Sequence, residues 1–258
     1  MIPLKTNAEM EIMRENGGLL ARILSSLCQQ VEPGRSTLFF DDLAEEMIRD
    51  EGAVPSFKGY SGYPATINAS LNDEVVHGIP VATRFLSDGD LFSIDIGLIR
   101  NGFHVDMATT VPVGEVSKEA QKLLDVGARS LWEGIEQVKI GNRLSDVSHA
   151  VGSYVESAGF HVVREYVGHG IGRALHEDPQ IPNYGPPGRG VRLQAGMAFA
   201  IEPMIKLDDL PTRVLDDEWT VVTGSGGLSV HFEHTVLLTE TGREIVTRGG
   251  EERRSGNE

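Results

Sequence analysis

The sequence has only one cysteine, Cys28, among its 258 residues, which excludes a disulfide within the chain. We interpret Cys28 as a packed side chain on a helix, and a lone cysteine fits a reducing compartment. No apolar run approaches the roughly 20 residues of a membrane-spanning helix. The first residues lack the charged and then apolar layout of a signal peptide. We therefore expect a cytoplasmic protein with no membrane partner.

Positive charge is also scarce. Lys and Arg number 23 against 38 Asp and Glu, which gives a formal net charge of −15. This balance disfavours long-range attraction to nucleic acid, so we expect no specific nucleic-acid partner. The hydrophobic share of 40% is ordinary for a globular protein that buries a sizeable core. The excess of acids leaves carboxylates available as metal ligands.

Two helices are predicted at the start of the chain. Thr6 and Glu9 have the spacing of a capping box, and apolar residues then recur at helical spacing as far as Pro33-Gly34. A second helix is predicted from about Thr37 to Gly52. Two β-rich segments follow, residues 91–99 and 103–111, and the Asn101-Gly102 pair between them is a strong hairpin signal.

The middle of the chain repeats this beginning. Helices are predicted from about Lys118 to Val138 and from about Leu144 to Gly159. Three pairs of residues at or near the ends of the predicted helices are each 107 positions apart. They are Val31 and Val138, Gly34 and Gly141, and Gly52 and Gly159. We interpret this as a weak internal duplication. It predicts one α/β sandwich of two related halves, with central strands and outer helices.

We expect one catalytic domain over residues 1–248, with halves at about 6–115 and 116–248. Residues 249–258 are polar and charged, and we expect them to form a frayed tail.

Two aspartates are predicted to meet across the hairpin. Asp95 lies within Ile94-Asp95-Ile96, where a buried acid is costly unless something positive meets it. Asp106 lies on the other arm, so that the two carboxylates can lie close together. Like charges at that distance would raise each other's pKa, and a bound divalent cation removes the conflict.

Three further segments place an acid or imidazole among apolar residues or glycines. His169 is flanked by Gly168 and Gly170, which let the backbone approach a site closely. Glu202 ends an apolar strand before Pro203, and Glu233 follows Phe232. Four ionised carboxylates balance two divalent cations, and oxygen ligands with one nitrogen suit Mn, Fe, Co or Zn. The set therefore predicts a pair of metals.

Each residue taken alone has a structural alternative. Asp95 could be an edge residue, Glu202 a strand end, and Glu233 a partner of Arg243. His77 alone would more often be a turn histidine than a catalytic one. Five remaining histidines are interpreted as structural or surface residues: His104, His149, His161, His231 and His234. His234 could still support a metal ligand from outside the set. The prediction of a metal site therefore depends on the set of five.

In this order and spacing, four motifs resemble the type I methionine aminopeptidases. They are Asp95 with Asp106, Gly168-His169-Gly170-Ile171-Gly172, Ile201-Glu202-Pro203-Met204 and Phe232-Glu233-His234-Thr235. The resemblance runs from about Lys5 to Thr247. It implies the pita-bread fold of the M24 peptidases, an α/β (α+β) fold with a curved, mostly antiparallel sheet. Its two pseudo-symmetric halves agree with the repeat.

The resemblance also implies roles for the residues. Asp95 would bind one of two divalent metal ions, His169 and Glu202 the other, and Asp106 and Glu233 would bridge them. His77 and His176 match substrate-contacting histidines of the family. Positions that line the pocket for a methionine side chain match Tyr60, Tyr63 and Trp219. Phe57 and Asn68 stand where cysteines are common, and Leu175 stands where an aromatic is common.

The implied activity is that of a metalloprotease which removes the N-terminal initiator methionine of nascent proteins when the second residue is small. The resemblance implies that metal-activated hydroxide would attack the first peptide bond, with His77, His176 and Glu202 as catalytic residues. The ribosome is a candidate partner, and we expect a monomer. The short spacing from His176 to Glu202 and the absence of an amino-terminal zinc finger fit the bacterial form.

Two alternative functions are also compatible with the sequence. One is a pita-bread peptidase that cleaves before proline, although such enzymes usually carry a further amino-terminal domain. The other is a catalytically inactive pita-bread protein that binds peptides, although such proteins tend to lose metal ligands.

Overall fold

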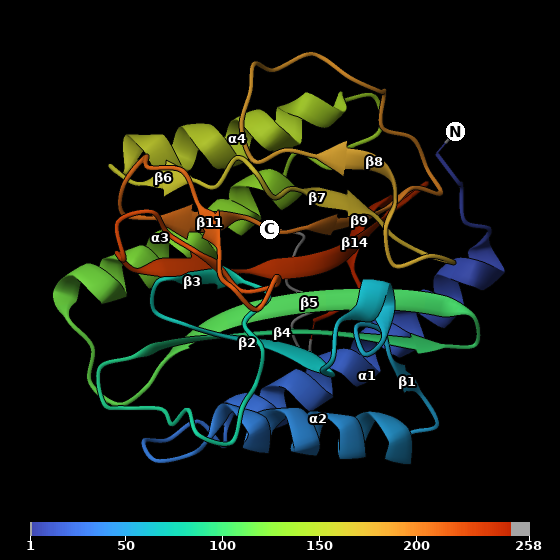
Figure 1. The fold of residues 1–258 in the computed structure, drawn as a ribbon. Helices are drawn as coiled ribbons and strands as arrows, with labels where there is room; N and C mark the ends of the chain where they lie inside the picture. Colours follow the sequence, from blue (N-terminus) through green and yellow to red (C-terminus); the bar gives the residue numbers. More distant parts are fainter. Residues whose placement is uncertain (1, 249–258) are drawn as a thin grey trace.

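The computed structural model describes residues 2–248, in which helices cover the outer sides of a curled antiparallel sheet (Figure 1). The helices are α1 (Asn7–Cys28), α2 (Thr37–Asp50), α3 (Lys118–Ile135), α4 (Leu144–Ser157) and the 3-10 turn η1 (Tyr60–Gly62). The α/β fold predicted from the sequence is confirmed. None of the helices in this part of the chain is long and apolar enough to cross a membrane.

A nine-stranded sheet forms the centre of the molecule, with the path β1-β4-β5-β14-β9-β7-β8 and with β2 and β15 paired at its sides. Its strands are β1 (Val54–Pro55), β2 (Ile67–Leu71), β4 (Leu91–Arg100), β5 (Phe103–Pro112), β7 (Gly168–Gly170), β8 (Glu177–Ile181), β9 (Ala198–Ile201), β14 (Glu233–Thr239) and β15 (Gly242–Ile245).

Two small three-stranded sheets, which the sequence analysis did not predict, complete the fold. One is β13-β10-β6 and the other is β11-β12-β3. Their strands are β3 (Glu74–Val76), β6 (His161–Val162), β10 (Met204–Lys206), β11 (Arg213–Val214), β12 (Val221–Val222) and β13 (Ser229–His231). Strands of two or three residues carry too little alternation to be recognised in sequence.

Local sequence signals account for the helix ends. The capping box at Thr6 is formed, since the Glu9 amide donates to the Thr6 hydroxyl and the Glu9 carboxylate accepts from the Thr6 amide at 2.7 Å. The helix predicted over residues 118–138 ends three residues earlier, at Ile135. Its last predicted residues form a turn in which the Val138 amide donates to the Ile135 carbonyl.

The 107-residue offset reappears in the structure. Helix α2 spans residues 37–50 and α4 spans 144–157, so both ends of the helix are displaced by the same 107 residues. Gly34 and Gly141 both have positive φ, at 89° and 93°. Only glycine adopts such a backbone without strain, and this explains why both turns keep it. The domain boundary near residue 115 stays a prediction, and the predicted tail lies outside the described residues.

The hydrophobic core has two large clusters, one with each pair of helices, and a small third cluster among the short strands. Helices α1 and α2 pack on β2, β4 and β5 through buried residues that include Leu20, Phe40 and Phe92. Helices α3 and α4 pack on β9 and β14 through residues that include Leu131 and Phe199. Figure 1 shows the first pair of helices along one side of the strands and α4 along the opposite side.

The long β4–β5 hairpin is fixed to α1 by one buried amide. The Asn101-Gly102 turn has φ values of 53° and 78°, as the sequence predicted for a two-residue hairpin. The fully buried Asn16 of α1 donates from Nδ2 to the Arg100 carbonyl at 2.8 Å and to the Phe103 carbonyl at 2.9 Å. Both carbonyls flank the turn, so this one side chain ties the hairpin's end to the helix.

We expect Asn16→Ala to lower the free energy of unfolding by about 1–3 kcal/mol, because the two carbonyls lose their buried donor. Urea denaturation measures the change. Glu15→Ala is the matched control, since Glu15 is the exposed neighbour on the same helix. A change for Asn16→Ala no larger than that of the control would contradict the role of this amide.

Candidate metal centre

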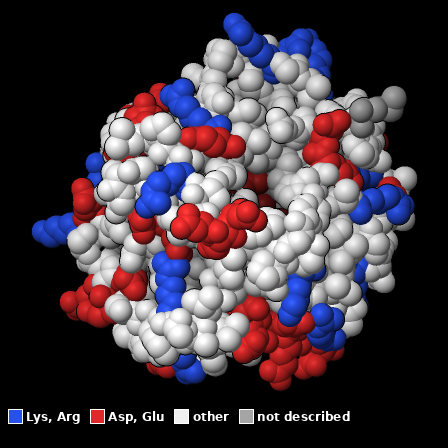
Figure 2. Space-filling model, viewed as in Figure 1, with Lys and Arg blue, Asp and Glu red and all other residues white. Residues whose placement is uncertain are grey.

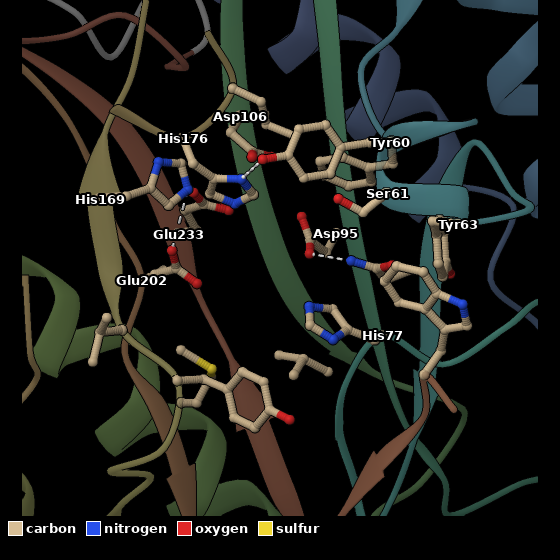
Figure 3. Close-up of a pocket in the computed structure, with 18 residues that line it drawn as sticks. Tyr60, Ser61, Tyr63, His77, Asp95, Asp106, His169, His176, Glu202 and Glu233 are labelled. Carbon is tan, nitrogen blue, oxygen red and sulfur yellow. Dashed lines mark hydrogen bonds and ion pairs between the residues drawn. The ribbon is translucent and has the colours of Figure 1, made fainter. Parts of the chain in front are cut away.

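Five neighbouring strands of the central sheet each bring one metal-ligand type of side chain to the same place. In the order β4, β5, β14, β9 and β7, the strands supply Asp95, Asp106, Glu233, Glu202 directly after β9, and His169. All five side chains line one cavity (Figure 3). The structure therefore brings together residues that are up to 138 positions apart in the sequence.

The hairpin register places the two aspartates on one face. Asp106 lies opposite Gly97, and Gly97 is two residues from Asp95, so both carboxylates point to the same side of the sheet. A side chain at position 97 would crowd the site, since a Cβ there would lie 3.0 Å from the Phe57 ring and 3.3 Å from Asp106 Oδ1. The glycine thus leaves the space between the two acids open.

The other three groups come from the second half of the chain. Glu233 is paired with Ala108 of β5, and His169 is paired with Ala200 of β9. Ligand atoms of Asp106, His169 and Glu233 all lie within 4.8 Å of one another, which suffices for one ion to contact all three. Glu202 Oε1 lies 3.5 Å from His169 Nε2.

The protonation of His169 follows from its surroundings. Its Nδ1 lies 2.9 Å from the Gly170 carbonyl, which can only accept, so Nδ1 carries the proton. Burial lowers the pKa of His169 to about 3, so the ring is neutral near pH 7. Its Nε2 therefore presents a lone pair toward Glu202. Either a proton on Glu202 or a bound cation must lie between these two atoms. The Gly170 bond fixes the ring in the way that outer-shell partners fix the histidine ligands of metals.

Most of the buried side-chain polar atoms that lack a hydrogen-bond partner in residues 2–248 lie at this site. Within residues 2–248, Asp95 Oδ1, Asp106 Oδ1 and Glu233 Oε1 are buried and have no hydrogen-bond partner. Most buried polar atoms in folded proteins have such a partner. Each of these three oxygens belongs to a predicted ligand, so the donor set fits divalent cations.

Burial and mutual repulsion make the carboxyls hard to ionise without a cation. Burial raises the pKa of Asp95 to about 6 and that of Glu202 to about 8. The pKa values of Asp106 and Glu233 are raised well above their usual range by burial, and next by the charges of neighbouring acids. Asp106 and Glu233 thus follow the rule for like charges in a shared buried site.

The cavity encloses about 270 Å³ and opens on one face of the molecule. Figure 2 shows that face hollowed near its centre, with acidic atoms inside the hollow. The volume lies at the small end for ligand pockets. It therefore suits one side chain and the adjoining peptide bond better than a longer segment.

His77 enters the cavity from a strained turn. Its φ is 61°, a left-handed value that costs a residue other than glycine free energy. The next residue, Gly78, lies so close to β2 that a Cβ there would be 2.7 Å from the Ala69 carbonyl oxygen. Burial lowers the pKa of His77 to about 4, so this ring is also neutral. The turn holds a neutral imidazole facing the metal ligands.

His176 lies at the other side of the cavity. Its Nδ1 is 2.7 Å from the Tyr60 hydroxyl, and its ring centre is 4.3 Å from that of His169. The Tyr60 bond orients the ring while Nε2 remains available to a ligand. Figure 3 shows His176 and His77 on separate sides of the acids, with room between them.

An apolar part of the cavity adjoins His77. The rings of Tyr63 and Trp219 pack edge to face with centres 5.0 Å apart. The Tyr63 hydroxyl shares its one proton between the carbonyls of Ile67 and Gly78, at 3.0 Å and 3.1 Å, so its polar end is satisfied within the protein. Phe57 and Leu175 add further apolar surface. This part of the cavity can hold an unbranched apolar side chain.

Asn68 stands between the apolar part and the acids. It pairs with Asp95 across β2 and β4, and its Nδ2 donates to Asp95 Oδ2 at 2.6 Å. One oxygen of Asp95 is thus held while the other is free. Asn68 stands where cysteines are common in the family, and its bond to Asp95 was not predicted from the sequence.

All ten predicted site residues line this one cavity. One residue beside the site was not predicted: His231 was interpreted as structural or surface. His231 is 2% exposed, and its Nε2 lies 3.6 Å from Glu202 Oε2. The available signal was strand alternation, which placed His231 on the same side as Glu233.

The chain is similar in sequence and in structure to known metallopeptidases. Residues 11–240 match metallopeptidase family M24. The chain is 52% identical over 248 residues to methionine aminopeptidase 1 of Bacillus subtilis, covering 96% of this chain and 100% of that protein. A crystal structure of methionine aminopeptidase from Thermotoga maritima superposes with a TM-score of 0.94 at 44% identity, covering 96% and 100% of the two chains.

A prolidase from Pyrococcus furiosus shares the fold at lower identity, with a TM-score of 0.77, 22% identity, and coverage of 95% of this chain and 65% of that one. It shows that the curled sheet is common to enzymes of different specificity. Three observations identify the same family. They are the match over 230 residues, the relative with 52% identity, and the cluster of acids with one imidazole. This chain belongs to metallopeptidase family M24 and has its pita-bread fold.

Proposed function

We propose that this chain is a methionine aminopeptidase, a hydrolase that removes the N-terminal methionine of new polypeptides when the second residue is small. The observation that carries the proposal is the convergence of Asp95, Asp106, His169, Glu202 and Glu233 on one cavity. The relatives of about half-identical sequence are named methionine aminopeptidases, and the chain spans their full length. Prolidases and other X-Pro peptidases resemble it at only 19–22% identity.

Two divalent cations fit the ligand set. We assign Asp95 to one, His169 and Glu202 to the other, and Asp106 and Glu233 to both. The close approach of Asp106, His169 and Glu233 supports this assignment, as do the unpaired oxygens of Asp95, Asp106 and Glu233 in the described chain. When bound, such a pair activates water as a nucleophile and polarises the scissile carbonyl. Mn, Fe, Co and Zn are the candidates for this donor set.

The chain's own residues then handle protons and orientation. We assign Glu202 as the group that accepts the proton of the attacking water and passes it to the leaving amine. Its carboxyl lines the cavity with the other four predicted ligands, where the attacking water and the leaving amine would lie. His176, held by Tyr60 at Nδ1, is placed to donate from Nε2 to the carbonyl oxygen as charge develops.

His77 is assigned to the scissile nitrogen. Its neutral ring faces the acids from the side of the apolar pocket, and its strained backbone argues for a positional role. The methionine side chain would occupy the pocket of Tyr60, Tyr63 and Trp219, where a thioether gains dispersion contacts with aromatic rings. Since the cavity admits one residue, the substrate is cleaved at its end.

The setting of the reaction follows from the substrate. New chains carry their initiator methionine where they are synthesised, so we place the enzyme in the cytoplasm beside the ribosome. We expect it to act as a monomer.

We expect the metal-stripped protein to release no methionine, and activity to return when Mn, Fe, Co or Zn is restored in turn. Among peptides, Met-Ala should be cleaved faster than Met-Leu, because a bulky second residue meets the wall of a small cavity. X-Pro peptides lacking methionine serve as the control panel. Equal rates on Met-Ala and Met-Leu, or cleavage of the X-Pro panel alone, would refute the assigned specificity.

His77→Ala should retain metal binding yet lower kcat by about 100-fold or more, within the range for groups that assist proton movement. Calorimetric titration with Mn²⁺ and steady-state kinetics measure the two properties. His161→Ala is the control, because His161 lies on β6 outside the cavity lining. A normal kcat in His77→Ala would remove this residue from the mechanism.

The stabilisation by added Mn²⁺ should grow as pH rises from about 7 to about 8.5. Without metal, Glu202 has its pKa raised from 4.5 to about 8, so its contribution to stability is lost as pH rises through that value. The raised pKa values of Asp106 and Glu233 act in the same direction. The buried histidines have lowered pKa values and are neutral in both folded and unfolded states over most of this window.

Thermal unfolding with and without Mn²⁺ measures this effect. Asp106→Asn should lose most of the Mn²⁺ response, whereas the control Asp42→Asn, an exposed residue of α2, should keep it. A Mn²⁺ shift that is the same at both pH values would contradict the linkage between ionisation and metal binding.

A further inference from the structure

One buried imidazole beside the site has no role in the mechanism so far. His231 ends β13, and its backbone is clamped to Thr110 of β5. The His231 amide donates to Thr110 Oγ1 at 2.8 Å, and Thr110 Oγ1 donates to the His231 carbonyl at 2.9 Å. Because the Thr110 proton is used there, the Ser93 hydroxyl donates to Thr110 at 2.8 Å. Three strands thus fix the position of His231.

The side chain of His231 points at Glu202. Its Nε2 is buried, has no hydrogen-bond partner within residues 2–248, and lies 3.6 Å from Glu202 Oε2. A buried polar atom without a partner is uncommon. A shift of a few tenths of an ångström makes this contact a hydrogen bond.

The two oxygens of Glu202 face different kinds of nitrogen. Oε1 faces His169 Nε2 at 3.5 Å, and that nitrogen has only a lone pair because the His169 proton is on Nδ1. Oε2 faces His231 Nε2, which no other group in the described chain engages. A carboxylate can only accept, so the favoured tautomer of His231 carries its proton on Nε2.

We propose that His231 is a positioning residue for Glu202: its Nε2–H donates to Glu202 Oε2 and holds Oε1 toward His169 and the metal that both would bind. This inference rests on the proposed metal centre and deepens it. It assigns distinct tasks to the two oxygens, one turned to the cation and the other held by the protein. Outer-shell partners of this kind typically change metal affinity or activity by about 10–100-fold when removed.

The test compares two replacements of similar size. His231→Leu removes the donor, while His231→Gln keeps an N–H donor near the same place. We expect His231→Leu to bind the weaker of two Mn²⁺ equivalents about tenfold less tightly and to lower kcat about 10–100-fold with little change in KM. His231→Gln should recover most of both losses. Calorimetric titration with Mn²⁺ gives a readout that is independent of turnover.

His234→Leu is the matched control. His234 neighbours Glu233, but its Nδ1 contacts Thr247 Oγ1 at 2.9 Å and its ring packs on Trp132. This variant should lose thermal stability while its Mn²⁺ affinity stays close to wild type. Thermal unfolding of all variants establishes that each is folded in the titration.

Three outcomes would overturn the proposal: unchanged Mn²⁺ affinity and kcat in His231→Leu, equal losses in His231→Leu and His231→Gln, or an equally large loss of affinity in His234→Leu. A wild-type protein that binds no Mn²⁺ would instead overturn the proposed metal centre and this inference together. Wild-type binding with any of the three outcomes would leave the metal centre standing and remove only the role of His231.

Discussion

The repulsion among four buried carboxylates is the constraint on which the rest of this structure depends. Asp95, Asp106, Glu202 and Glu233 are held in one cavity. Burial raises the pKa of all four, and neighbouring carboxylates raise the pKa values of Asp95, Asp106 and Glu233 further. Hydrogen bonding within the protein does not resolve the conflict, since three of their oxygens lack a partner in residues 2–248. A fold that keeps such a cluster must either hold it protonated or bind cations, and the neutral His169 favours cations.

The architecture serves this constraint by dividing the ligands among five adjacent strands. Backbone pairing fixes each strand against the next, so the spacing of the ligands is set by the sheet and not by flexible loops. Short-range contacts then refine single atoms: Asn68 holds one oxygen of Asp95, and Gly170 fixes the ring of His169. The substrate-facing histidines come from outside the main strands, where His77 occupies a strained turn and His176 is oriented by Tyr60.

Much of this could be predicted from local sequence. The Thr6 capping box, the Asn101-Gly102 turn and the alternation around Asp95 are short-range signals, and each predicted its element correctly. The candidate metal ligands could be predicted because an acid flanked by apolar residues in a strand is costly to bury unless a cation meets it. The pairing of β14 with both β5 and β9 could not be derived, because it depends on contacts between distant segments. For the same reason the contact of His231 with Glu202 was not predicted, although strand alternation had placed His231 on the side of Glu233.

The central claim is that divalent cations occupy the space among these acids and neutralise them. Anomalous X-ray scattering from crystals grown with Mn²⁺ tests it most directly, because it locates the ions independently of activity. We predict two peaks inside the cavity, one beside Asp95 and one beside His169 and Glu202, with Asp106 and Glu233 in contact with both. No peak there, or Mn²⁺ only on the outer surface, would contradict the account.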